Sequence, residues 1–215
     1  MGKGYKLHYV LLDSVLEILF MGRRSVFNEL SRIIAGPISV KYVDSTVIKA
    51  TGNEVCVLDY YIDAECIGNC IKVGRSVEHV ELMGELINAV SSVLNSGLIK
   101  MGIDYGTERV GVILVYDNTP LIGDVLTPVK LMKLLKVING KLGYVAVGDS
   151  PIVHRFLRRS VKDLCLIADN VLIIDELESS RLRSWVSTNG LIDDVADAYA
   201  ITLTKPKMII KCPQD

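Results

Sequence analysis

Residues 100–114 read KMGIDYGTERVGVIL, and this stretch decides the fold. The pattern predicts a buried strand, a tight glycine turn and a second apolar strand that doubles back on the first. One carboxylate, Asp104, stands inside the first of these strands. Burying a charge is unfavourable unless a partner neutralises it, and a metal ion is the usual partner. The rest of the chain must therefore supply the groups that surround Asp104.

From residue 98 onward the chain alternates between strand-like and helix-like patterns. Asp117 to Pro120 has the composition of a turn, and Ser150-Pro151 is typical of the start of a helix. Three antiparallel strands followed by alternating helices and strands predict a mixed α/β sheet. The expected strands are 99–105, 109–117, 120–126, 142–148 and 170–175, and the expected helices are 127–138, 151–167 and 190–204.

The first 97 residues have the pattern of a small α+β unit. Helical periodicity covers residues 25–35 and 78–94. Residues 38–49 and 54–64 flank Thr51-Gly52-Asn53, a pattern that predicts a hairpin. A loop near residue 97 separates this unit from the larger one, so we expect two domains, 1–97 and 98–215. The smaller domain is a candidate for dimerisation or substrate selection.

The composition excludes a disordered chain but does not indicate a particular class of partner. Half of the 215 residues are hydrophobic, and 24 basic residues balance 25 acidic ones, so no global charge favours nucleic acid. Basic residues dominate between 127 and 162, which is typical of a phosphate-binding face and equally of solvated helices. The apolar run 9–21 contains two acids and is too short to span a bilayer. We expect a cytoplasmic protein without membrane association.

The five cysteines give no clear framework for disulfides or zinc. They are odd in number and contain no Cys-x-x-Cys pair, and Cys66 and Cys70 stand four residues apart without a nearby histidine. We expect reduced thiols rather than disulfide bonds or metal ligands.

Four acids stand at the ends of the predicted elements. Asp104 and Asp149 belong to strand ends, and Asp194 and Asp197 lie three residues apart, hence on one face of the last helix. Carboxylate oxygens at separated element ends suit Mg²⁺ or Mn²⁺. Structural explanations stay open for two of them, because Asp149 also suits a turn and Asp194 also suits a helix N-terminus.

Two motifs together resemble the ribonuclease H-like nuclease superfamily, and within it the RuvC Holliday-junction resolvases and their YqgF-type relatives. They are GIDYGT at 102–107, followed by Val110-Gly111, and DVADAYAI at 194–201. The resemblance covers residues 98–206. It implies a five-stranded sheet in the order 3-2-1-4-5, flanked by helices. Asp104 and Asp149 would then meet, and the last helix would deliver Asp194 and Asp197 as catalytic metal ligands.

The chain departs from these families at identifiable positions. RuvC enzymes usually carry Glu where this chain has Asp149. The segment Asp175-Glu176-Leu177 resembles the Asp-Glu-Arg-Leu segment of YqgF-type proteins without its arginine. Asp197 follows the RuvC pattern instead. Whether Glu176 or His154 joins the site stays open.

The resemblance implies a nuclease that uses Mg²⁺ or Mn²⁺ to hydrolyse phosphodiester bonds in branched DNA or structured RNA, as in DNA repair and recombination, and that acts as a homodimer. Two alternatives stay open: a catalytically silent interaction protein with this fold, and an ATPase of the sugar-kinase and actin type, which would need a second lobe. Trp185 would either stack on bases or pack against the last helix. The candidate nucleic-acid contacts are Arg109, Lys130, Arg155, Arg158 and Arg181.

Overall fold

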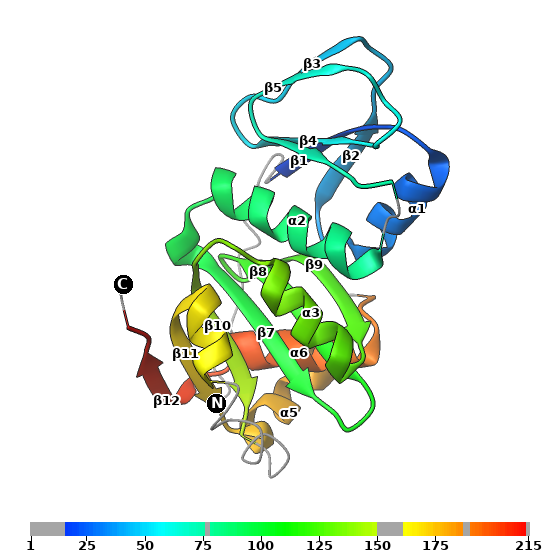
Figure 1. The fold of residues 1–215 in the computed structure, drawn as a ribbon. Coiled ribbons are helices and arrows are strands. Elements are labelled where there is room, and N and C mark those ends of the chain that lie inside the picture. Colours follow the sequence, from blue (N-terminus) through cyan, green and yellow to red (C-terminus); the bar gives the residue numbers. More distant parts are fainter. Residues whose placement is uncertain (1–15, 76–77, 150–160, 187–189, 214–215) are drawn as a thin grey trace, which may run out of the picture.

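The computed structural model describes residues 16–75, 78–149, 161–186 and 190–213. The chain forms an α/β protein with a large mixed sheet, helices on both faces of that sheet and a smaller N-terminal unit (Figure 1). The α/β class and the mixed sheet predicted from the sequence are confirmed.

The large sheet has six strands in the order β9-β8-β7-β10-β11-β12. The pairs β7–β8 and β8–β9 are antiparallel, β10 is parallel to both β7 and β11, and β12 is antiparallel to β11. Numbered along the chain from β7, the order reads 3-2-1-4-5-6. The strands are β7 (Ile99–Tyr105), β8 (Val110–Tyr116), β9 (Thr119–Leu126), β10 (Leu142–Gly148), β11 (Ala168–Ile174) and β12 (Pro206–Lys211).

The predicted five-stranded sheet is therefore wrong, because β12 extends it at one edge. This strand reads PKMIIK and is mostly exposed, with lysines at Lys207 and Lys211. Lysine and an initial proline are typical of edge strands, which contribute little to the hydrophobic pattern. The sequence therefore gave β12 no clear strand signal.

The turn between β8 and β9 follows the sequence prediction. Asp117 and Asn118 have positive φ angles of 43° and 65°. Two such residues form the mirror-image turn that matches the twist of an antiparallel hairpin. The hydroxyl of Tyr199 donates a hydrogen bond of 2.5 Å to the Asn118 carbonyl and thereby ties this turn to the last helix.

Helices cover both faces of the large sheet (Figure 1). On one face lie α2 (His79–Val93), α3 (Pro128–Val137) and the helical residues 161–167. On the other face lie α5 (Glu176–Val186) and α6 (Asp193–Leu203). The helix predicted at 151–167 falls largely outside the described residues. None of the described helices combines the length and apolar character needed to cross a membrane.

Helix α6 lies unusually close to the sheet because glycines face it. A Cβ atom on Gly102 would lie 2.2 Å from the Ala198 carbonyl oxygen, and one on Gly111 would lie 1.9 Å from the Asp194 carbonyl oxygen. Both distances are shorter than real Cβ contacts allow. The helix backbone therefore rests directly on β7 and β8.

We predict that Gly111→Ala lowers the free energy of unfolding by about 1–3 kcal/mol or more, because the added methyl group meets backbone that cannot move aside cheaply. Gly140→Ala is the matched control, since a Cβ atom there meets nothing within 4 Å. Urea denaturation measures both variants. Equal midpoints for Gly111→Ala and the parent would contradict the close packing.

The N-terminal unit contains a four-stranded parallel sheet in the order β2-β1-β4-β6 and a separate parallel pair, β3–β5. Helix α1 (Arg24–Ile33) connects β1 to β2, and the short helix η1 (Ser96–Leu98) precedes β7. The strands are β1 (Leu16–Met21), β2 (Ile38–Tyr42), β3 (Val47–Lys49), β4 (Glu54–Leu58), β5 (Glu65–Ile67) and β6 (Cys70–Lys72).

The predicted hairpin between residues 38–49 and 54–64 is wrong. A turn does form there, with Gly52 at φ +59°, but β2 and β4 both pair with β1 in parallel. Strand β4 is buried along almost its whole length, as expected for a strand inside a parallel sheet. The central strand β1 was not predicted, so its two neighbours were wrongly paired with each other.

The N-terminal unit and the large sheet share one hydrophobic core. A single cluster of buried side chains runs from Leu16 and Leu30 through α2 to Ile103 and Leu164. At the edge of the large sheet, the Ala35 N–H donates to the Leu121 carbonyl of β9 over 2.9 Å. Helix α2 therefore packs against both sheets.

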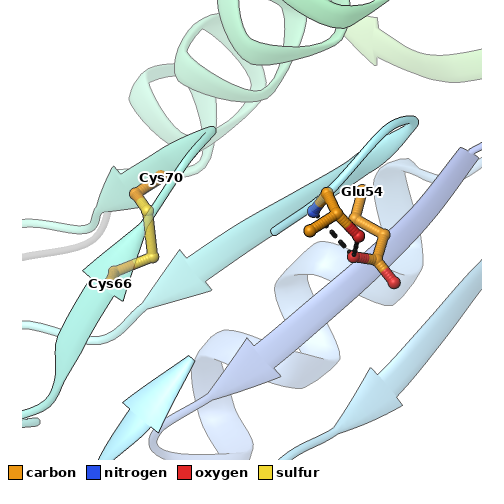
Figure 2. The surroundings of a disulfide bond; sticks show 4 residues. Glu54, Cys66 and Cys70 are labelled. Carbon is orange, nitrogen blue, oxygen red and sulfur yellow. Dashed lines mark hydrogen bonds between the residues drawn. A yellow bond between two sulfur atoms is a disulfide. The ribbon is translucent and has the colours of Figure 1, made fainter. Parts of the chain in front are cut away.

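Two disulfides correct the expectation of reduced thiols. Cys66 pairs with Cys70, which joins β5 to β6 (Figure 2), and Cys165 pairs with Cys212 near the end of β12. Only Cys56 is a free thiol, and it is buried. The sequence could not reveal the second pair, because its cysteines are 47 residues apart and meet only after β12 adds to the sheet.

We predict that an alkylating reagent in denaturant labels one thiol per chain before reduction and all five afterwards. Mass spectrometry of the intact protein counts the labels, and peptide mapping should place the single label on Cys56. Five labels before reduction would show that neither disulfide forms.

Candidate functional site

The pleat of β7 directs Asp104 toward α6. Residues two apart on a strand share a face, and Gly102, which contacts α6, stands two residues before Asp104. In the β7–β8 pair, Asp104 lies opposite Gly111, whose Cα also faces α6. The carboxylate therefore lies on the sheet face that α5 and α6 cover.

Two helices bring further carboxylates to this face. The first two turns of α6 carry Asp194 and Asp197, and the carbonyl of Asp194 lies over Gly111. Glu176 begins α5, and its Oε1 atom comes within 2.8 Å of the position that a Cβ atom on Gly148 would take. Because that glycine lacks a side chain, Glu176 can lie over the end of β10.

These carboxylates change one another's protonation. Burial, followed by the negative charges of Asp197, Glu176 and Asp194, raises the pKa of Asp104 from 3.8 to about 6, against a smaller opposing effect of Arg183. Burial likewise raises the pKa of Asp197, with Arg183 opposing and Asp194 adding to it. Asp104 is therefore the centre of an acidic cluster built from β7, α5 and α6.

Basic side chains pair with the acids around Asp104. The guanidinium of Arg109, from the β7–β8 turn, lies 2.6 Å from Asp194, and that of Arg183, on α5, lies 3.1 Å from Asp197. Both arginine side chains are about half exposed or more, at 64% and 49%. They hold positive charge at the outer side of the cluster.

Asp149 lies in a different environment from the other predicted ligands. Strand β10 does pair with β7, as the resemblance implies. The Asp149 carboxylate, however, accepts a hydrogen bond of 2.6 Å from Lys207 of β12. Strand β12, which the sequence did not predict, thus provides the lysine that pairs with Asp149.

The carboxylates of this cluster are the kind of ligand that suits a divalent cation. In the structure, however, Asp194 and Asp197 form ion pairs with arginines. Clustered carboxylates are the ligands that Mg²⁺ and Mn²⁺ prefer. Within the described part of the chain, however, no group of three or more His, Cys, Asp or Glu side chains is arranged to hold a metal ion.

The candidate nucleic-acid contacts are dispersed. Arg109 and Arg181 belong to the β7–β8 turn and to α5, on the side of the acids. Lys130 is exposed on α3, which covers the opposite face of the sheet. Trp185 is 40% exposed on α5. Arg155, Arg158 and His154 lie outside the described residues.

Three contributors to this region escaped the sequence prediction or stayed open in it. Glu176 had a usable signal, since it follows a predicted strand in a segment similar to YqgF-type proteins. Arg183 lies on α5, a helix that the sequence did not predict. Lys207 had no signal, because its strand was not predicted.

Comparison with known proteins gives no relative. No protein-family model, no curated protein and no solved structure matches this chain. The resemblance to ribonuclease H-like nucleases therefore depends on the two quoted motifs.

We predict that Asp104→Asn increases the free energy of unfolding at pH 7–8 by about 1–3 kcal/mol. The substitution removes a carboxylate whose ionised form is destabilised in the folded protein. The pKa of Asp104 is raised, so its unfavourable contribution is complete above pH 6 and fades as the pH falls toward 3.8. The gain should therefore disappear near pH 4. Chemical denaturation at pH 4, 6 and 8 tests this, and a gain independent of pH would contradict it.

Proposed function

We propose that this protein is a divalent-metal-dependent phosphodiesterase of the ribonuclease H-like, RuvC-related class. The observation that carries the proposal is Asp104, a largely buried carboxylate whose pKa is raised to about 6 by burial and by acids from two helices. Perturbed acids of this kind concentrate at functional sites. The mixed sheet and the two motifs support the same class.

The chain's own residues have distinct roles in this proposal. Asp104, Glu176 and Asp197 would hold the cation, with Asp194 beside them. In such sites a divalent ion activates water and stabilises the leaving oxygen of a phosphodiester. Arg109 and Arg183 stand at the exposed rim, where a guanidinium group can contact phosphate. Asp149 takes a supporting place near Lys207.

The proposed substrate is branched DNA, with structured RNA as the other candidate, and the proposed active form is a homodimer. Paired cuts across a junction need two active sites, which a two-fold dimer provides. The phosphate backbone would be bound by basic side chains, so binding should weaken as the salt concentration rises.

We predict that the parent protein cleaves a labelled four-way DNA junction in Mn²⁺ and that Asp104→Asn reduces cleavage by about a hundredfold or more, since a group central to catalysis is lost. Asp193→Asn is the matched control, because it removes an exposed acid one residue before Asp194 on the same helix. Gel electrophoresis of the cleaved strands gives the rates, and a structured RNA is assayed in parallel. Equal rates for Asp104→Asn and Asp193→Asn would refute the proposal.

The ion pairs favour a second candidate, a catalytically silent interaction protein. Arg109, Arg183 and Lys207 already pair with Asp194, Asp197 and Asp149. In a silent protein such pairs would be permanent. Calorimetric titration with Mn²⁺ separates the candidates, because the silent protein binds no ion at this cluster and the nuclease binds one that Asp104→Asn weakens.

A further inference from the structure

His79 connects three elements of the fold through its two ring nitrogens. It is the first residue of α2, and its Nδ1 lies 2.8 Å from the Oε2 of Glu29 on α1. Its Nε2 lies within hydrogen-bond distance of the carboxylate of Asp124 on β9. The side chains of His79 and Asp124 are only 18% and 19% exposed.

This arrangement requires a protonated imidazole. A neutral imidazole has one N–H donor and one nitrogen lone pair, whereas the imidazolium ion has two donors. Because carboxylate oxygens face both nitrogens, only the imidazolium can donate to each of them. A neutral ring would leave a lone pair facing one carboxylate.

The surrounding charges agree with this state. The hydrogen bonds that His79 donates to Asp124 and to Glu29 raise its pKa, with partial burial opposing. The hydrogen bond to His79 lowers the pKa of Glu29. For Asp124 burial acts to raise the pKa, but the hydrogen bond to His79, the backbone hydrogen bond of Val125 and the nearby positive charges together lower it. Arg32 on α1 acts on both carboxylates, and on α2 the neighbouring Glu78 pairs with Lys133 of α3.

The triad stands where the N-terminal unit meets the edge of the large sheet. Strand β9 is the last strand in the sheet order, and residues Ile34 and Ala35 pair with its Ile122 and Leu121. Asp124 lies just beyond these pairs along β9. The triad therefore joins α1 and α2 to the strand whose free edge the N-terminal unit covers.

We propose that His79 is a pH-dependent clamp that fastens α1 and α2 to the edge strand β9 while its imidazole ring is protonated. Loss of the ring proton removes one of the two charge-assisted hydrogen bonds and leaves a partly buried carboxylate facing a lone pair. The contact between residues 34–35 and β9 then opens more often. This clamp is independent of the proposed nuclease activity.

The direction of the pH effect follows from the pKa shifts of the three residues. The pKa of His79 is raised, so the stabilisation that His79 provides is complete below its ordinary pKa of 6.5 and is lost as the pH rises through the raised pKa. The pKa values of Glu29 and Asp124 are lowered, so their contributions are lost only in acid. The clamp is closed below the ordinary pKa of 6.5 and opens as the pH rises through the raised pKa of His79.

Amide hydrogen exchange of Ala35 tests the clamp, because this N–H donates directly across the contact to Leu121. Protection, corrected for the intrinsic exchange rate, should fall about tenfold above the titration of His79, the loss expected for one charge-assisted hydrogen bond. In His79→Gln the protection should be lowered already below pH 6.5, where the parent His79 is protonated, and it should lose this step. NMR of the ring protons gives the titration of His79 in the same samples.

Two further variants keep the test decisive if His79→Gln folds poorly. Asp124→Asn should shift the His79 titration toward lower pH, whereas Glu85→Gln, which changes an exposed acid elsewhere on α2, should leave it in place. The clamp is overturned if His79 titrates at or below its ordinary pKa. It is equally overturned if Ala35 protection passes through that titration unchanged.

Discussion

The close approach of α6 to the sheet is the constraint on which the rest of the structure depends. Gly102 and Gly111 remove the side chains that would hold the helix backbone away, and Gly123 on β9 leaves room for the side chain of Val195. Helix α6 also carries small residues, since Ala196, Ala198 and Ala200 are all buried. Small residues on both surfaces permit the backbone of α6 to contact β7 and β8 directly. This contact fixes which helix residues lie above Asp104.

This close packing also brings negatively charged side chains together, and their repulsion opposes folding. A helix seated so closely brings Asp194 and Asp197 near a strand carboxylate that is already poorly hydrated, and α5 adds Glu176. Like charges in a partly buried place oppose folding unless cations compensate them. Arg109 and Arg183 provide that compensation from the rim. Natural proteins tolerate such unfavourable clusters mainly where function requires them, which is why this cluster is the basis of the proposed activity.

The sequence predicted the elements of the large sheet best where the signal was local. The strands predicted at 99–105 and 142–148 have the same bounds as β7 and β10, because apolar runs flanked by glycine or polar residues specify them without help from distant parts. Helix α5 was missed because only Ser179 and Val186 are buried on it, so its apolar pattern is weak. Parallel pairing is non-local, and the order β2-β1-β4-β6 could not be derived from turns.

The acidic site was partly predictable for the same reason. Asp104 and the α6 acids belong to patterned elements whose faces follow from periodicity. The basic partners of these acids do not follow from periodicity, because Arg109, Arg183 and Lys207 come from a turn, from α5 and from β12. The pairing of Lys207 with Asp149 depends on a strand that lies 58 residues away in sequence. Side-chain partners separated by such distances are set by tertiary structure alone.

The N-terminal unit is best understood as a cover for surfaces that the large sheet cannot protect by itself. Helix α2 contributes Leu82, Leu86 and Val90 to the common core, and the segment after α1 pairs with the open edge of β9. An uncovered edge strand invites pairing with other chains, and an uncovered apolar face invites association. A chain lacking this unit would expose both at once. Any role of the described residues 16–75 and 78–97 in recognition must therefore be performed by their outward surfaces, because their inner surfaces already pack against the rest of the fold.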